Sequence, residues 1–318
     1  TFGGKEVVLI SENGPENTVI DGQSNGSRIF EITQGETFNT EINGFTLTNA
    51  QCDVGAAIRI LNDSYLTVDN CIISNNYGQM SHSGFGVVAI GKESNFGSYS
   101  NAAINLLNST LTDNSSYYGG AVFNSTLAGS PQSQFVGCTF IDNTAYHHPA
   151  IHSTKQSNIE NCIFINNQAT GPINAVIGNE GGSPTIINCT FVDNNSYAIG
   201  RNNPEIQTVI VNSIFYNNLG TINEADANYF NISYSNLQED WSGEGNINED
   251  PQFNDDYTLQ PTSPCIDTGD PESELDPDGT RADMGAHYFH QESDIEGCTD
   301  PYAENFNETA NVDDGSCL

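Results

Sequence analysis

Three aspartates recur at equivalent places along this chain, and their type and spacing come nearest to catalytic chemistry. Asp113, Asp142 and Asp193 each directly precede an asparagine that closes a short repeated motif. In the other copies the same place is taken by Asn75, Asn166 and Asn217. Carboxylates on adjacent repeats are what a glycoside hydrolase needs. Asp and Asn are also routine turn residues, so the column has a structural interpretation as well.

The motif that carries these aspartates is Asn-Cys-x-Phe-x-x-Asn or a close variant. Its copies begin at residues 70, 108, 137, 161, 188 and 212. The closing asparagine recurs at steps of 38, 29, 24, 27 and 24 residues, which gives the column Asn76, Asn114, Asn143, Asn167, Asn194 and Asn218. A period in the twenties that carries short β-type segments is a solenoid signature.

The length of the repeat indicates which solenoid this is. The copy around Asn161 offers three short strands, at residues 150–152, 157–159 and 162–164. Leucine-rich and helical repeats need long helical stretches, and no useful apolar run with helical spacing appears. The sequence therefore predicts a right-handed parallel β-helix with three strands per turn, or rung, and roughly eight or nine rungs stacked about 4.8 Å apart.

The repeated positions also predict what each side chain does. The first residue of each copy is Asn, or Gly at position 137, and these residues tolerate the left-handed backbone of a sharp bend. The closing asparagines suit a stacked amide ladder or solvated turns. Because side chains alternate along a strand, the cysteines and the phenylalanines two positions later should share the interior: Cys71, Cys138, Cys162, Cys189, Phe140, Phe164, Phe191 and Phe215.

The charge balance excludes some partners. The 318 residues include 41 Asp and Glu against 7 Lys and Arg, a net charge of −34. Such a chain is not attracted to nucleic acid or to an anionic membrane, and it favours cations. No apolar run of 18 residues occurs, so no membrane span is expected.

The chain divides into three expected parts. Residues 1–237 form the β-helix, with loops leaving it near 77–102 and 115–134. Residues 238–296 are acidic and rich in Pro and Gly, and we expect them to close the C-terminal end of the cylinder. Residues 297–318 form a small module with little apolar content, for which a disulfide between Cys298 and Cys317 is the expected staple.

Motifs at both ends of the chain resemble a known family, and the resemblance covers nearly its whole length. Residues 245–253, 263–270 and 276–286 are similar to the closing region of secreted bacterial β-helix proteins of the choice-of-anchor type, in the pectate-lyase-like superfamily, and residues 3–10 and 17–22 are similar to their first rungs. The 297–318 module is similar to one found before the sorting domain of type IX-secreted proteins. The resemblance implies export and surface display but no particular reaction. The family's N-terminal capping segment and its sorting domain are not part of this sequence.

Calcium is the cofactor that the sequence suggests. Asp276, Asp278 and Asp283 surround one glycine turn, and Asp300, Asp313 and Asp314 lie near another. Hard cations take such oxygen ligands. Neither stretch fits a complete EF-hand loop, and acidic turns without an ion are the alternative.

Two other clusters have competing interpretations. The spacing of His147, His148 and His152 allows two of them to share a metal, but exposed turn histidines are the favoured interpretation. The aromatic residues Phe96, Tyr99, Tyr117 and Tyr118 suit loops that bind glycans. The basic residues are scattered, which speaks against the arginine or lysine base of a polysaccharide lyase.

The sequence therefore predicts a non-catalytic structural or adhesive protein, extracellular or at the cell surface. Its expected partners are extracellular polysaccharide and copies of itself. Because the sequence opens directly on a strand at residues 6–10, we expect that open end to meet the C-terminal region of a neighbour, head to tail, giving filaments. The alternatives are a carbohydrate-active enzyme, either a polysaccharide lyase or a glycoside hydrolase, and a glycan-binding module.

Overall fold

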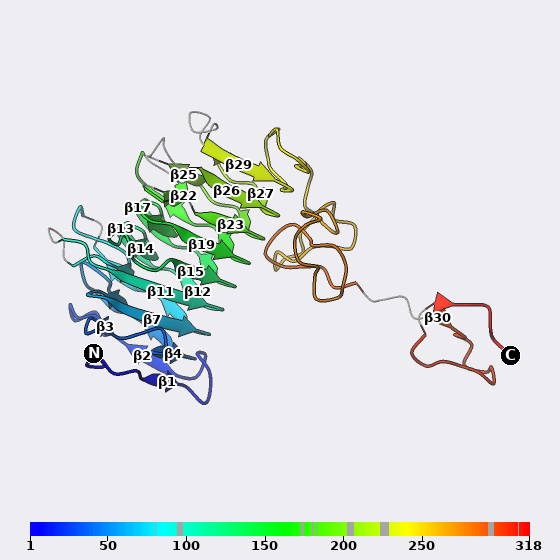
Figure 1. The fold of residues 1–318 in the computed structure, drawn as a ribbon, viewed down its shortest axis with the longest axis horizontal. Helices are drawn as coiled ribbons and strands as arrows, with labels where there is room; N and C mark the ends of the chain where they lie inside the picture. Colours follow the sequence, from blue (N-terminus) through cyan, green and yellow to red (C-terminus); the bar gives the residue numbers. More distant parts are fainter. Residues whose placement is uncertain are drawn as a thin grey trace.

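The computed structural model describes residues 1–79, 81–93, 98–172, 175–179, 181–182, 184–201, 207–222, 229–291, 296–310 and 312–318. Parallel strands stack in successive rungs into a β-helix, as predicted (Figure 1). Each rung visits three long sheets in the order A, B, C, and eight rungs are followed by a last strand in sheet A.

The strands of the long sheets are short, with three to six residues each. Sheet A contains β1 (Val8–Ile10), β4 (Glu41–Asn43), β7 (Ser64–Asp69), β11 (Ala102–Leu107), β15 (Ser133–Val136), β19 (Ser157–Glu160), β23 (Thr185–Ile187), β26 (Thr208–Val211) and β29 (Phe230–Ser233). Sheet B contains β2 (Val19–Asp21), β5 (Thr46–Thr48), β8 (Ile72–Ser74), β12 (Thr110–Thr112), β16 (Thr139–Ile141), β20 (Ile163–Ile165), β24 (Thr190–Val192) and β27 (Ile214–Tyr216).

Sheet C and a smaller sheet D complete the cylinder. Sheet C contains β3 (Phe30–Ile32), β6 (Ile58–Ile60), β10 (Val88–Ile90), β14 (Val122–Asn124), β18 (Ile151–Ser153), β22 (Ala175–Asn179), β25 (Tyr197–Arg201) and β28 (Gly220–Ile222). Sheet D lies between B and C in four middle rungs and contains β9 (Tyr77–Gly78), β13 (Ser115–Tyr118), β17 (Thr144–His147) and β21 (Gln168–Ala169).

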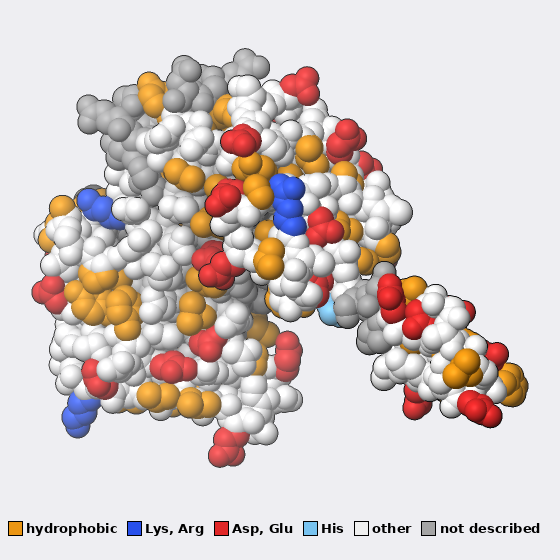
Figure 2. All heavy atoms as spheres, turned by 45° about the vertical axis from the view of Figure 1, so that its right-hand side comes forward, with side chains coloured by type: hydrophobic (Ala, Val, Ile, Leu, Met, Phe, Trp, Pro, Cys, Tyr) orange, Lys and Arg blue, Asp and Glu red, His pale blue; other side chains and the backbone are white. Residues whose placement is uncertain are grey.

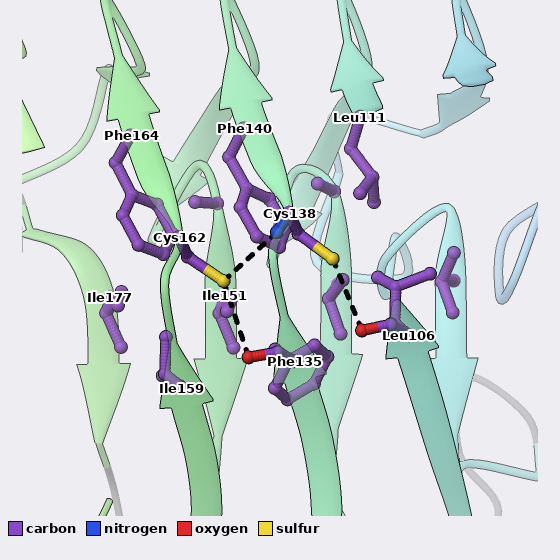
Figure 3. Close-up of a cluster of buried hydrophobic side chains, with 14 of the residues drawn as sticks. Leu106, Leu111, Phe135, Cys138, Phe140, Ile151, Ile159, Cys162, Phe164 and Ile177 are labelled. Atoms are coloured by element: carbon purple, nitrogen blue, oxygen red, sulfur yellow. Dashed lines mark hydrogen bonds between the residues drawn. The ribbon is translucent and has the colours of Figure 1, made fainter. Parts of the chain in front are cut away.

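The interior columns follow the predicted alternation. Phe140, Phe164, Phe191 and Phe215 pair in register on sheet B, and neighbouring rings stack 4.5–4.9 Å apart within 7° of parallel. The four cysteines of the motif are buried as free thiols, and Figure 3 shows Cys138 and Cys162 beside Phe140 and Phe164. Burial raises the pKa of Cys138 and Cys162, so these thiols are neutral packing groups.

The closing asparagines form the amide ladder. Asn114 is typical: its Nδ2 donates to the Oδ1 of Asn143 on the next rung at 3.1 Å and to the carbonyl of Ile73 at 2.7 Å. Its backbone N–H also donates to the Oδ1 of Asn143. The same bonds repeat from Asn76 to Asn218, and the five asparagines before Asn218 are at most 2% exposed. The alternative of solvated turns is therefore wrong.

Residues after the last rung lie in two places. Leu237 is buried in the interior core, against which Trp241 also packs. Residues 253–289 instead pack on the outer face of sheet B, where Leu259 and Met284 meet Ile214. Figure 1 shows this segment beside the cylinder. The outward residues Ile163 and Ile165 of β20 and Val192 of β24 are apolar, which explains why this stretch of the sheet is covered.

The C-terminal module has its own small framework. The predicted disulfide joins Cys298 to Cys317, and β30 (Glu296–Gly297) pairs in parallel with β31 (Val312–Asp313). The six other cysteines are free thiols, and all except Cys52 are buried.

Candidate functional site

The three aspartates proposed for catalysis lie in one surface column, at the turn after each strand of sheet B. Asp113, Asp142 and Asp193 have φ of 54°, 56° and 58°, in the left-handed region. The asparagines that replace them in other rungs have φ of 48–54°. Asp and Asn tolerate this conformation better than most residues, so the backbone alone accounts for their choice.

Their carboxylates accept hydrogen bonds from neighbouring side chains. The Nδ2 of Asn166 donates to Asp142, and the Nδ2 of Asn217 donates to Asp193. The hydroxyl of Tyr257 reaches the second oxygen of Asp193 at 3.1 Å. These carboxylates thus tie one rung to the next and to the segment that covers sheet B.

The acidic residues of the 276–283 turn organise the covering segment. Asp283 is 3% exposed, and its two oxygens accept the backbone N–H groups of Asp267 and Phe289 at 2.7 and 2.6 Å. Asp276 accepts the N–H of Asp283 at 2.9 Å. Asp278 accepts the N–H of Thr280 at 3.1 Å and that of Gln291 at 2.7 Å. Carboxylates here replace the backbone carbonyls that regular structure would supply.

The protonation of this turn is uneven. Burial, reinforced by the nearby carboxylates of Asp283, Asp278 and Asp267, raises the pKa of Asp276 to about 6. Burial also raises the pKa of Asp283. The N–H of Gln291 and the bonds from Thr280 lower the pKa of Asp278 to about 2. The neighbouring carboxylates repel one another, so a bound cation would stabilise their charged forms here.

The calcium prediction remains untested by this geometry. Asp300, Asp313 and Asp314 accept the N–H groups of Tyr302, Gly315 and Ser316, two residues further on in each case. Over the described ranges, no three His, Cys, Asp or Glu side chains are arranged to hold a metal ion. In both predicted ligand sets the carboxylates accept backbone N–H groups.

The histidines are not exposed turn residues, so that expectation is wrong. His148 and His152 are 1% and 3% exposed. The ring of His152 stacks on Phe123 with centroids 4.7 Å apart. His148 has a φ of 56°, at the position where preceding rungs have Gly86 and Gly119, and its Nδ1 lies 3.3 Å from the carbonyl of Ala175.

Burial sets the charge of these rings. It lowers the pKa of His148 to about 4 and lowers that of His152 as well. Both rings are therefore neutral near pH 7, and they pack as aromatic groups between sheets C and D.

Two of the four aromatic residues proposed for glycan binding serve packing. Tyr117 is buried and stacks on Tyr146 at 4.6 Å, and Tyr118 stacks on Phe85 at 5.2 Å. Tyr99 is 41% exposed and has the ammonium of Lys92 4.4 Å from its ring centroid. Phe96 lies outside the described residues.

Comparison with known proteins gives no identity. No protein-family model and no curated protein matches the chain. In the part of the chain that the structure describes, no helix has the length and apolar character needed to cross a membrane.

Proposed function

We propose that the chain is a non-catalytic structural or adhesive protein that forms a rigid, acidic rod outside the cell or at its surface. The observation that carries the proposal is the set of hydrogen bonds that the aspartate column makes. The carboxylates of Asp142 and Asp193 accept bonds from amides of the following rung, in left-handed turns that require such residues. Two of the three catalytic candidates of the sequence thus have a role as joints between rungs, and the third, Asp113, accepts a bond from Thr112 of its own rung.

Export is supported by cysteine chemistry and by surface charge. The Cys298–Cys317 disulfide belongs to a small module of the kind that persists in oxidising surroundings. Acidic side chains are spread over the face drawn in Figure 2, where basic ones are few. Together with the resemblance to choice-of-anchor proteins, these features favour display at the cell surface after type IX secretion.

Self-assembly is part of the proposal. In the first rung, Leu9, Ile20 and Phe30 are only partly buried against the core, and β1, β2 and β3 each end their sheet. Such an edge accepts further strands, from the same polypeptide or from a neighbouring copy stacked head to tail. The net charge of −34 opposes sideways association of the rods.

Turnover assays test the non-catalytic role. The purified protein is incubated with neutral and acidic polysaccharides, and new reducing ends and unsaturated products are measured. We expect none, from either the native protein or the Asp113→Asn, Asp142→Asn, Asp193→Asn triple variant. Turnover by the native protein that the triple variant lacks would overturn the proposal.

Location and assembly need separate measurements. Antibody labelling of intact cells of the source organism should detect the protein, and protease treatment of those cells should remove the signal. Electron microscopy of native material should show rods joined end to end. Labelling only after the cells are broken would contradict surface display, and single particles at every concentration would contradict head-to-tail assembly.

A further inference from the structure

A groove of about 720 Å³ runs between the cylinder and the segment that flanks it. Its floor follows the corner between sheets A and B over four consecutive rungs, from Asn108 through Gly137 and Asn161 to Asn188. Residues 273–277 and 285–288 line the opposite wall. The volume falls in the range of small-molecule and oligomer sites.

The wall is held in place before any ligand arrives. The N–H of Gly285 donates to the carbonyl of Asn212 at 2.8 Å, and the N–H of Ala286 donates to the Oγ1 of Thr190 at 3.0 Å. The side chain of Asn212 also donates to Ser273 at 3.1 Å. Since both ends of the wall are bonded to the cylinder, the groove is preorganised.

The floor alternates polar and apolar groups. Glu160, the last residue of β19, pairs in register with Val136 on one side and Ile187 on the other, and all three line the groove. Asn161 and Asn188 also line the groove on this side. This mixture offers hydrogen-bond donors and acceptors beside apolar surface.

The wall adds charge and an aromatic ring. Glu274 and Asp276 line it, and His287 is the only residue capable of positive charge among the described lining residues. Tyr288 and Leu275 are 42% and 63% exposed. A half-exposed aromatic ring beside carboxylates and amides suits the C–H face and the hydroxyls of a sugar, while the carboxylates repel anionic ligands.

We propose that this groove binds an uncharged oligosaccharide, laid along the cylinder axis with one sugar against Tyr288 and hydroxyls bonded to Glu160 and the floor amides. The site is distinct from the aromatic loops singled out in the sequence. It gives the rod a specific adhesive surface, yet a rod that binds no sugar would still be the proposed scaffold. Failure of one proposal therefore leaves the other standing.

The test is a binding assay on the whole chain with defined probes. Immobilised hexaoses of glucose, xylose, mannose and N-acetylglucosamine represent uncharged glycans, with oligogalacturonate and hexalysine as charged comparisons. The best ligand is then titrated by calorimetry against three variants. Tyr288→Ala removes the ring, Glu160→Arg fills the floor, and Tyr99→Ala is the matched control at 41% exposure on another part of the surface.

We expect at least one uncharged hexaose to bind, with the affinity falling about tenfold or more in Tyr288→Ala and lost in Glu160→Arg. Tyr99→Ala should bind as the native protein does. Residue 160 is on the outer side of its strand, so the thermal midpoint of Glu160→Arg should equal that of the native protein. If Tyr288→Ala unfolds, binding by Glu160→Arg tests the proposal instead. The proposal is overturned if no uncharged hexaose binds, if only hexalysine or oligogalacturonate binds, or if Tyr99→Ala alone weakens binding.

Discussion

The asparagine ladder and the acidic turn of residues 276–283 solve one problem in two ways. Both satisfy buried backbone N–H groups with side-chain oxygens. In the ladder, Asn143 accepts from the rung before it and donates to the rung after it, and its neighbours do the same. In the acidic turn, Asp283 accepts the backbone N–H of Phe289, and Asp278 accepts that of Gln291. Each of these bonds is made once and does not form part of a repeated series. Repetition makes the ladder one continuous network, whereas the turn consists of separate joints.

The ladder ends on Gln238, a residue that follows the last rung and precedes the acidic turn. The backbone N–H of Asn218, the last of the ladder, donates to the Oε1 of Gln238 at 2.8 Å, and Gln238 returns a bond to the carbonyl of Asn218 at 2.9 Å. A longer amide on the following segment thus completes the ladder without another rung. We infer that damage to the ladder should destabilise the whole cylinder, while damage to the turn should release only the covering segment.

Asn143→Ala should have the largest effect. The change removes the acceptor of two buried donors of Asn114 and leaves the carbonyl of Leu111 without the 2.8 Å bond that it now receives. Each unsatisfied buried group costs about 1–3 kcal/mol, so we expect a loss of about 3–5 kcal/mol in the free energy of unfolding. Urea denaturation followed by circular dichroism measures it.

The adjacent residue provides the matched control. Asp142→Asn keeps the left-handed turn and an oxygen acceptor, so its urea midpoint should stay close to that of the native protein. If Asn143→Ala lowered the free energy of unfolding no more than Asp142→Asn does, the ladder would not be a source of stability.

Repetition also decided what the sequence predicted well. The ladder, the phenylalanine column and the left-handed bends were correct because six copies of one motif fixed the register between rungs. The flanking position of residues 253–289 has no repeat to reveal it. A signal was present: outward positions of sheet B change from Thr110 and Thr112 to Ile163 and Ile165.

The candidate sites were predicted less well, for a related reason. His148 takes the left-handed position that Gly86 and Gly119 hold in preceding rungs, and this column of mixed residue types does not reveal the burial of its ring. The groove residues Glu160 and Tyr288 are 128 positions apart and belong to no common motif. Only the packing of an irregular segment on the cylinder brings them together.

Asp283→Ala should produce the second-largest effect, confined to the segment. The N–H groups of Asp267 and Phe289 lose their acceptors, at a cost of about 1–3 kcal/mol that removal of a buried carboxylate partly offsets. Limited proteolysis should cleave within residues 253–291 faster, while the circular dichroism of the β-helix stays the same. Asp283→Asn, which keeps one acceptor, should be intermediate. Loss of the β-helix signal in Asp283→Ala would show that the two regions are not separable.

Asp276→Asn should have a smaller effect that depends on pH. Since burial raises the folded-state pKa of Asp276 from 3.8 to about 6, its charged form is disfavoured in the native segment. The penalty is complete above about pH 6 and disappears as the pH falls toward about 4, so the native segment should resist proteolysis better at pH 4.5 than at pH 7.5. Because the side chain is half-buried, the gain from Asp276→Asn at pH 7.5 should be under about 1 kcal/mol. If Asp276→Asn keeps the pH dependence of the native protein, another titratable group causes that dependence.

Calcium should have the smallest effect on stability. Where it binds would show whether the acidic turn can take up a metal ion in addition to its backbone bonds. The carboxylates of the turn already serve backbone N–H groups, so an added ion meets oxygens with part of their capacity in use. Binding in the millimolar range of weak extracellular sites would add about 0.4 kcal/mol when the calcium concentration equals Kd. Calcium should protect the protein from proteolysis more than magnesium does. If the covering segment is the site, this protection should disappear in Asp276→Asn. It should persist in the double variant Asp313→Asn, Asp314→Asn. The reverse pattern would place the ion in the C-terminal module, and protection equal to that of magnesium would mean that both metals act only by screening the charge of the chain.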